Sequence, residues 1–367
     1  MKKLFALLLV AVLMAGLFCG CNDGETNQPT DKITLNVYNW GQYISDGSDD
    51  SLDVIAAFEA KYPHIKVNYS TFDSNEVMYT KLAGGGITVD LIIPSDYMIS
   101  RMRKEGMLLE LNYDNIPNYR YIADTFKGMN YDPEEKYTVP YAWGTVGIVY
   151  NTKYVAEEDL TGWELLWNEK YDDKILMYDN SRDAFGIAQL RLGYSLNTDD
   201  EAQLRACADL LAQQKPLVQQ YVMDQIFDLM QNEEAWIAPC YAGDYVTMAD
   251  ENEDLAFYRP ESGFNLFMDA MCIPSCCQEK EAAELFINFL CEPEIAAANM
   301  DWICYSTPLD KEVMAEFMDP EVLDDPAAYP SEEMIWEMIE QDRMFKDLSP
   351  ATSRLMESLF LKARISK

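Results

Sequence analysis

Histidine is almost absent from this chain of 367 residues, and basic residues are scarce. His64 is the only histidine, which excludes Ser-His-Asp catalysis, Cys-His catalysis and metal sites built from several histidines. The 28 Lys and Arg face 63 Asp and Glu, so the net charge is −35. This charge leaves no basic surface for phosphates and excludes a nucleic-acid partner. It favours a cationic ligand or partner, unless it serves solubility alone.

Long hydrophobic runs are also lacking, since the apolar run at residues 4–18 is too short for a comfortable transmembrane helix. Two lysines precede it and Gly20-Cys21 follow it, a pattern typical of a secretory signal. The Gly-Cys pair resembles the lipobox of bacterial lipoproteins. We therefore predict a signal peptide at 1–20, a lipidated Cys21 and a polar tether over 21–31, with cleavage without lipid as the alternative.

Few motifs in the rest of the chain indicate a catalytic, metal or phosphate site. Seven of the nine cysteines remain beyond residue 21, so at least one is a free thiol, and most are expected to be small buried hydrophobic residues. No C-x-x-C pair or Gly-rich phosphate loop is present, and residues 84–86 are expected to form a turn. The acidic run at 46–53 lacks EF-hand spacing and is expected to cap a helix rather than bind calcium. We predict neither a cofactor nor a metal.

Hydrophobic periodicity predicts an α/β protein with two lobes. At 49% hydrophobic the chain can bury large cores, and its length suits two lobes. Strands are predicted at 33–38, 65–69, 90–94 and 145–150, and helices at 53–61, 75–82, 184–192, 206–211, 224–230 and 281–290. This alternation predicts parallel sheets flanked by helices. Between two such lobes, a ligand binds naturally in the crevice at the carboxyl ends of the strands.

Eight segments, in order along the chain, resemble the bacterial spermidine/putrescine-binding proteins. They are VYNWGQYI at 37–44, TFDSNEVMY at 71–79, DLIIPSDY at 90–97, RMRKEGM at 101–107, VPYAWGT at 139–145, DNSRDAF at 179–185, FMD at 267–269 and YSTP at 305–308. The resemblance covers nearly the whole mature chain. These proteins are the extracytoplasmic receptors of polyamine ABC importers.

The resemblance implies a periplasmic-binding-protein architecture of type II, with the ligand clamped between two lobes. The chain would cross between lobes twice, so that 32–142 plus 268–314 form lobe 1 and 143–267 plus 315–367 form lobe 2. A polyamine ligand and the permease subunits of an ABC importer are the implied partners. We also expect a monomer, held at the outside of the cell membrane by its lipid.

Matched positions supply a candidate ligand-binding set of aromatic, polar and acidic residues. The resemblance places there Trp40, Tyr43, Ser95, Tyr97, Asn180, Asp183, Tyr241, Asp244, Phe267, Asp269, Tyr305 and Gln341. Aromatic faces suit methylenes, and carboxylates suit ammonium groups. Core packing is the alternative for Trp40, Phe267 and Tyr305, and an exposed position is the alternative for Tyr241. Asp269 stands alone in an apolar strand, so its burial needs a partner.

The chain departs from the spermidine-type pattern at two acidic positions. Gln42 and Asn180 are amides where that pattern has acids, and Asp183 is shorter than the usual Glu. Asp244 follows Tyr241 by three residues, as in putrescine-preferring members. Fewer acids suit fewer ammonium groups, so a diamine is expected to bind better than spermidine. Asp96 supplies a further acid or caps a helix.

Two other functions compete with polyamine capture. The amides at 42 and 180 leave open another small cationic or polar solute. A cell-surface hydrolase could use paired acids such as Asp183 and Asp269, but no nucleophile elbow, cofactor motif or second histidine supports it. We therefore predict a binding protein and not an enzyme.

Overall fold

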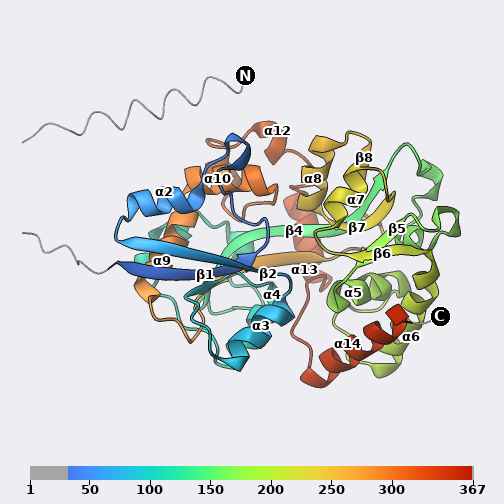
Figure 1. The fold of residues 1–367 in the computed structure, drawn as a ribbon, viewed down its shortest axis with the longest axis horizontal. Coiled ribbons are helices and arrows are strands. Elements are labelled where there is room, and N and C mark those ends of the chain that lie inside the picture. The colour runs from blue at the N-terminus through green and yellow to red at the C-terminus, as the bar shows by residue number, and fades with distance from the viewer. Residues whose placement is uncertain (1–31, 366–367) are drawn as a thin grey trace, which may run out of the picture. The chain divides into compact units, whose positions relative to one another are not determined.

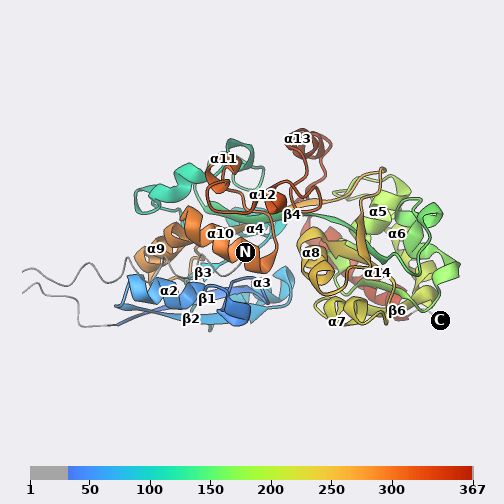
Figure 2. The same ribbon diagram turned by 90° about the horizontal axis from the view of Figure 1, so that it is seen from above.

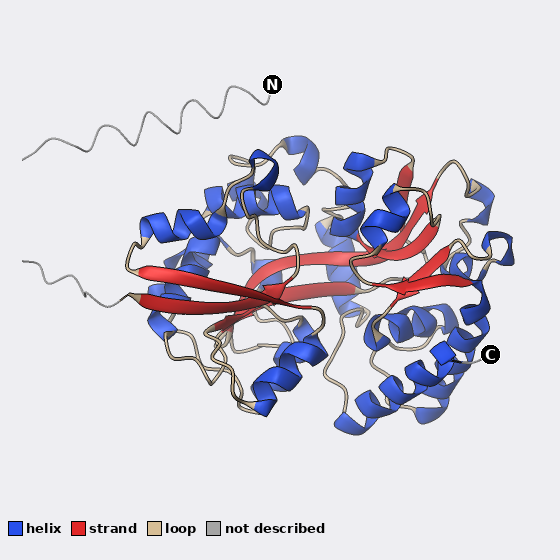
Figure 3. Cartoon of the chain, in the orientation of Figure 1, coloured by secondary structure: helices blue, strands red, loops and turns tan. Residues whose placement is uncertain are grey.

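Nine strands form the sheet framework of the computed structural model, which describes residues 32–365 (Figure 3). The strands are β1 (Ile33–Trp40), β2 (Ile65–Phe72), β3 (Leu91–Ile92), β4 (Thr138–Asn151), β5 (Ile175–Tyr178), β6 (Val218–Val222), β7 (Ile237–Tyr241), β8 (Leu255–Tyr258) and β9 (Leu266–Cys272). They pair in the order β2-β1-β3-β9-β4-β7-β5-β6, and β8 pairs with β4. The predicted signal peptide, Cys21 and the tether lie outside the described residues.

Helices cover both faces of this framework (Figure 1). They are α2 (Val54–Lys61), α3 (Asn75–Gly84), α4 (Asp96–Lys104), α5 (Ser181–Leu192), α6 (Glu201–Gln214), α7 (Ile226–Gln231), α8 (Ala242–Glu251), α9 (Lys280–Leu290), α10 (Pro293–Ile303), α11 (Lys311–Met314), α12 (Pro320–Leu323), α13 (Glu332–Glu340) and α14 (Pro350–Ile365). Short 3-10 helices lie at 48–50, 113–115, 117–121, 124–126, 157–159, 163–167, 169–171 and 215–217. Within residues 32–365, none of the helices combines the length and apolarity needed to span a bilayer.

Local sequence signals account for where many of these elements begin and end. All the predicted strands and helices are present, but the strand predicted at 145–150 is the second half of β4, which begins at Thr138, and the helix predicted at 206–211 is the middle of α6. The acidic run does cap a helix, because the Asp53 carboxylate accepts a hydrogen bond from the Ala56 N–H at 2.8 Å at the start of α2. Of the glycines expected to form a turn at 84–86, Gly84 is the last residue of α3, and Gly85 and Gly86 follow it with φ of 68° and 83°. His64 is exposed.

The prediction of parallel sheets is wrong at the centre of the framework. The β1–β2, β1–β3, β5–β6 and β5–β7 pairs are parallel. β4 and β9 pair antiparallel with each other, and β4 also pairs antiparallel with β7 and β8. The reason is topological, since β4 and β9 are long buried strands that cross the middle without a βαβ unit.

The long strand β4 joins two lobes, which separate clearly in the view from above (Figure 2). Its first part, Thr138–Thr145, pairs with β9, and its second part, Val146–Tyr150, pairs with β7. β1, β2, β3, α2 and α9 lie in one lobe, and β5, β6, α5, α6 and α14 lie in the other (Figure 2). The described residues from Ile33 onward form one compact unit by their contacts, so the lobe boundaries given above stay a prediction.

The seven cysteines beyond residue 21 are all free thiols. Cys207, Cys240, Cys272 and Cys291 are buried, which agrees with their expected role as small core residues. Cys276 is exposed, and Cys277 and Cys304 are half-buried.

Candidate functional site

Four of the predicted aromatic residues form a continuous row of rings where the two lobes meet. The ring centroids of Tyr43 and Tyr305 are 5.0 Å apart, those of Tyr305 and Phe267 6.1 Å, and those of Phe267 and Tyr241 5.4 Å. Tyr43 follows β1, Tyr241 ends β7, Phe267 lies on β9 and Tyr305 follows α10. Residues from four distant parts of the chain therefore share one aromatic wall.

Two glycines make room for this wall. A Cβ at position 144 would lie 2.7 Å from Cζ of Phe267, and a Cβ at position 243 would lie 2.5 Å from Cδ2 of Tyr305. Both distances are far shorter than a carbon–carbon contact allows. Any larger residue at Gly144 or Gly243 would therefore displace a ring of the wall.

Each tyrosine of the wall donates a hydrogen bond to a carboxylate. The Tyr43 hydroxyl donates to Asp269 at 2.8 Å, Tyr241 to Asp183 at 2.9 Å and Tyr305 to Asp244 at 2.7 Å. We call these six residues the tyrosine–aspartate cluster. The structure thus brings together all three acids of the predicted ligand-binding set, from α5, α8 and β9.

Burial disfavours the charged form of all three acids. It raises the pKa of Asp183 to about 7, and the negative charge of Glu76 adds to this effect while the Tyr241 hydrogen bond opposes it. Burial also raises the pKa of Asp244 to about 7 and that of Asp269 to about 6. A buried carboxyl group with a raised pKa loses its proton more readily when a cation lies beside it, because the cation stabilises the carboxylate.

Asp269 has a buried carboxylate oxygen without a hydrogen-bond partner among the described residues. Only 5% of its surface is exposed, and its Oδ1 is buried without a hydrogen bond. Hydrogen bonds from Ser95 and Tyr43 lower its pKa but do not offset burial. Ser95 also forms an isolated β-bridge with Asp269, which brings this predicted polar residue to the same place.

A second network connects Tyr97 to the cluster through residues that the sequence analysis did not single out. Asn75 donates to the Ser95 hydroxyl and to the Tyr97 hydroxyl, both at 3.1 Å. Tyr97 in turn donates to the Glu76 carboxylate at 2.9 Å. Asn75 and Glu76 lie in the segment 71–79 that carried part of the resemblance, but nothing in that segment distinguishes them from an ordinary first turn of a helix.

Asn180 supports Asp183 directly. Its side-chain oxygen caps α5 by accepting from the Arg182 N–H at 2.8 Å, and its Nδ2 donates to Asp183 at 2.7 Å. An acid at position 180 would place a second carboxylate against Asp183 instead of a donor. These two hydrogen bonds therefore explain why an amide suits position 180 in this chain.

Two predicted residues, Trp40 and Gln341, have other partners. Trp40 is half-buried, its Nε1 donates to the Ile93 carbonyl at 2.9 Å, and its ring packs on Phe72. Tyr241, within the cluster, is half-buried rather than exposed, and α8 begins at the next residue. Gln341 is exposed at the end of α13.

Gln341 is the predicted residue that the described contacts connect least to the cluster. It donates to the Glu337 carboxylate at 2.8 Å and accepts from Arg343. Its role as a ligand contact stays a prediction, as does that of Trp40.

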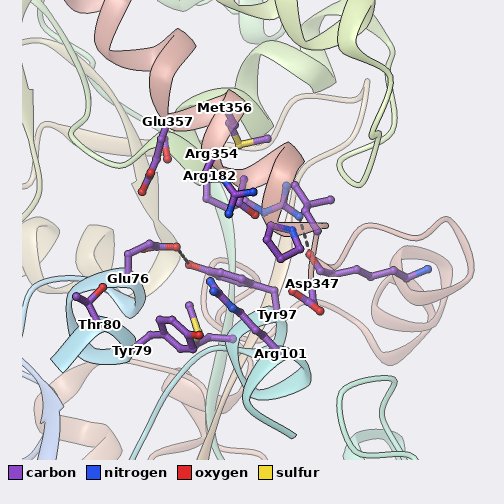
Figure 4. A pocket seen from close by; sticks show the side chains of 16 residues that line it. Glu76, Tyr79, Thr80, Tyr97, Arg101, Arg182, Asp347, Arg354, Met356 and Glu357 are labelled. Carbon is purple, nitrogen blue, oxygen red and sulfur yellow. Dashed lines mark hydrogen bonds between the residues drawn. The ribbon is translucent and has the colours of Figure 1, made fainter. Parts of the chain in front are cut away.

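A cleft of about 210 Å³ lies beside Tyr97 and Arg182 (Figure 4). Glu76 and Tyr97, from α3 and α4, line one side, and Arg182 and Glu357, from α5 and α14, line the other. Arg182 is held by hydrogen bonds to the carbonyl groups of Leu196 and Lys346 and to Asn197. The cleft is therefore formed by α3, α4, α5 and α14 and includes Glu76 and Tyr97 of the second network, whereas no residue of the tyrosine–aspartate cluster is among its lining residues.

Comparisons with known proteins identify the family of this two-lobed α/β chain. Residues 53–330 match the family model described as "Bacterial extracellular solute-binding protein". This chain belongs to that family. The predicted resemblance and fold are confirmed, and so is the prediction of a binding protein rather than an enzyme.

Named relatives of this solute-binding protein place it more closely. It is 31% identical over 307 residues to the spermidine/putrescine-binding periplasmic protein of Salmonella typhimurium, covering 83% of this chain and 86% of the relative. It is 28% identical to the putrescine-binding periplasmic protein SpuD of Pseudomonas aeruginosa over the full length of both. Both relatives are periplasmic by name, and the family is extracytoplasmic.

A solved structure agrees with the sequence comparison. The spermidine/putrescine ABC transporter substrate-binding protein PotD from Streptococcus pneumoniae superposes with a TM-score of 0.74 at 34% identity. The match covers 91% of this solute-binding protein and 99% of PotD. The two chains therefore share the fold over almost their whole length.

Proposed function

We propose that this solute-binding protein captures a polyamine, with putrescine favoured over spermidine, and delivers it to the permease of an ABC importer. The tyrosine–aspartate cluster carries the proposal. Three buried carboxyl groups with raised pKa values surround a row of aromatic rings, and this combination fits an apolar chain with cationic ends. The names of the relatives support the ligand class.

The chemistry of a diamine matches these groups one by one. Burying four methylenes yields roughly 3 kcal/mol at about 0.8 kcal/mol each. A cation over an aromatic ring adds about 0.5–2 kcal/mol. Charge-assisted hydrogen bonds to carboxylates then fix the ammonium ends. The tyrosine hydroxyls already occupy one side of each carboxylate, so they orient the free lone pairs toward a ligand.

The preference for putrescine rests on the number of acids. Asp183, Asp244 and Asp269 are the acids of the cluster, whereas Asn180 donates to Asp183 and Gln42 is an exposed amide. The third cationic nitrogen of spermidine would need a further carboxylate. Glu76 opposes this preference, because it lies close enough to Asp183 to raise its pKa, but it already accepts from Tyr97.

Competition between the two ligands is expected to favour putrescine. With purified protein loaded with labelled putrescine, spermidine should displace the label only in excess, because its third ammonium is incompletely paired at a cost on the order of several kcal/mol. Titration calorimetry with putrescine, cadaverine, agmatine, spermidine and spermine ranks the affinities of these polyamines. Displacement by spermidine below an equimolar amount would contradict the preference, and no saturable binding of any amine would contradict the function.

We further propose that Cys21 anchors the protein to the membrane by a lipid. A Cys21→Ala variant is expected to lose membrane attachment or to stay unprocessed, because Cys21 is the acceptor of the lipid. Fractionation with and without detergent, followed by mass spectrometry of the N-terminus, measures both. Cys304→Ala, which changes a cysteine far from the N-terminus, serves as the control. Membrane attachment of Cys21→Ala equal to that of the parent would show that the anchor lies elsewhere.

A further inference from the structure

A second cavity, of about 300 Å³, lies on the other face of α4 from the cleft of Figure 4. Asp96, Ser100 and Arg103 line it from one stripe of the helix, since they are spaced four and three residues apart. The segment 344–347 closes it from the other side. Asn197 fixes that segment by donating to the Met344 carbonyl at 2.9 Å and accepting from the Lys346 N–H at 2.7 Å.

Two buried polar groups in the cavity wall have no partner among the described residues. They are the hydroxyl of Tyr131 and Oδ2 of Asp96, in side chains that are 3% and 2% exposed. Buried polar groups in folded proteins are rarely left unpaired, because their desolvation is then not compensated. The proposed amine site does not use the Tyr131 hydroxyl, so the cavity has polar capacity beyond the proposed function.

Positive charge gathers around this cavity in a strongly acidic protein. Arg103, Lys104 and Lys346 line it. Lys104 pairs with Asp347 at 2.9 Å and Lys346 with Asp342 at 2.6 Å, so these two lysines are partly neutralised. Arg103 is half-buried and acts electrostatically on Glu134.

The remaining acid in the wall can act as a donor rather than as a negative charge. Burial raises the pKa of Asp96 well above its ordinary value, and the negative charge of Asp269 adds to this effect. Arg182 and the Tyr97 N–H oppose it. A protonated carboxyl donates a hydrogen bond. In its protonated form Asp96 therefore adds a donor, and no negative charge, to a wall that also holds Arg103 and Tyr131.

We infer that this cavity is a second ligand site, which takes a small oxyanion of the phosphate or carboxylate class. The Arg103 guanidinium supplies a fork of donors that matches such an anion. The Tyr131 hydroxyl donates from the buried end, and Lys104 and Lys346 lie at the mouth. A polyamine is a poorer occupant, because Arg103 lines the space and Asp347 is already paired with Lys104.

Calorimetry on the full-length mature protein with inorganic phosphate tests the site, at constant ionic strength and with chloride as the reference anion. Acetate in a parallel titration distinguishes a carboxylate preference from a phosphate preference. One saturable site per chain is expected for at least one of the two anions. Absence of saturable binding for both would overturn the inference.

Variants on the two faces of α4 locate the bound anion. Arg103→Gln is expected to weaken binding by about tenfold or more, because it removes the charged fork. Arg101→Gln makes the same charge change on the opposite face, where Arg101 pairs with Glu105, and should leave anion binding within about twofold. Equal losses in both variants would show a diffuse charge effect and overturn the inference.

Two further variants separate this site from the amine site. Tyr131→Phe removes only the unpartnered hydroxyl and is expected to weaken anion binding about threefold or more without loss of folding. Asp244→Asn, in an acid of the cluster that does not act on Asp96, should leave anion binding unchanged while putrescine binding falls. If Asp244→Asn instead abolished anion binding, the two ligands would share one site and the inference would be wrong.

Discussion

Replacing Asp269 by Asn is expected to weaken putrescine binding by about 1.5–3 kcal/mol, the scale of a charged hydrogen bond. This corresponds to a loss of affinity of roughly 10- to 150-fold. Asn keeps the shape of the side chain, and its oxygen can still accept from the Tyr43 hydroxyl. The variant therefore removes the charge that faces the ligand and little else.

The unliganded Asp269→Asn protein should be no less stable than the parent, which separates loss of binding from loss of folding. Burial raises the pKa of Asp269 to about 6, so at pH 8 the parent holds a buried charge that the variant lacks. Its melting temperature without ligand is expected to equal or exceed that of the parent.

Titration calorimetry and thermal melts at pH 8 measure both effects of Asp269→Asn. Asp209→Asn makes the same charge change at an exposed position of α6 and should leave both values unchanged. If Asp269→Asn bound putrescine within a few tenths of a kcal/mol of the parent, the anchoring charge would have to lie elsewhere.

Polyamine affinity is expected to fall steeply as the pH drops from 8 to 5. The pKa values of Asp183 and Asp244 are raised to about 7 and that of Asp269 to about 6, and a bound cation favours their charged forms. Each carboxyl that must lose a proton to bind costs about tenfold in affinity per pH unit below its pKa. One such carboxyl with a pKa near 7 predicts a loss of about 100-fold at pH 5, and several predict more.

The stability of the unliganded protein should fall as the pH rises, because of the same three carboxyl groups. A carboxyl whose pKa is raised by folding stabilises the native state below its unfolded pKa, and this contribution is lost as the pH rises through its folded pKa. The three acids therefore favour the empty fold below about pH 4 and oppose it above about pH 7. Ligand binding should therefore stabilise the folded protein most at high pH, where the three acids are charged.

Calorimetry in buffers of different ionisation enthalpy counts the protons released on binding. Release is expected near pH 6.5, where the three carboxyl groups are partly protonated. Asp244→Asn should lower the count, because one titrating group is gone. An affinity that stayed constant between pH 8 and pH 5 would show that the acids are already ionised without ligand.

The sequence by itself determined the local elements and several of their ends. Alternating polarity in 33–38 predicted β1, because alternate residues of a strand face opposite sides of the sheet. Asp53 marked the start of α2, because its carboxylate satisfies an N–H that the first turn leaves free. The ordered motifs also predicted the family and most of the candidate site, including the three acids that the structure brings together.

The tertiary structure alone decided the sheet and the pairing of side chains within the site. Periodicity shows which face of a strand is buried but not which strand lies beside it. The antiparallel pairing of β4 with β9 could therefore not be predicted from the sequence. Tyr43 and Asp269 are 226 residues apart, yet their hydrogen bond defines one end of the cluster. No local pattern could predict such a contact.

Burial is the other property that only the folded chain supplies. Asp183, Asp244 and Asp269 are ordinary acids in the sequence, and desolvation in the folded protein shifts their pKa values to about 6 or 7. The same holds for Asp96, which the sequence left open as a further acid or a helix cap, and which the fold buries in the wall of a second cavity. Charge and polarity were present in the sequence, but their environment came from the packing of segments far apart in it.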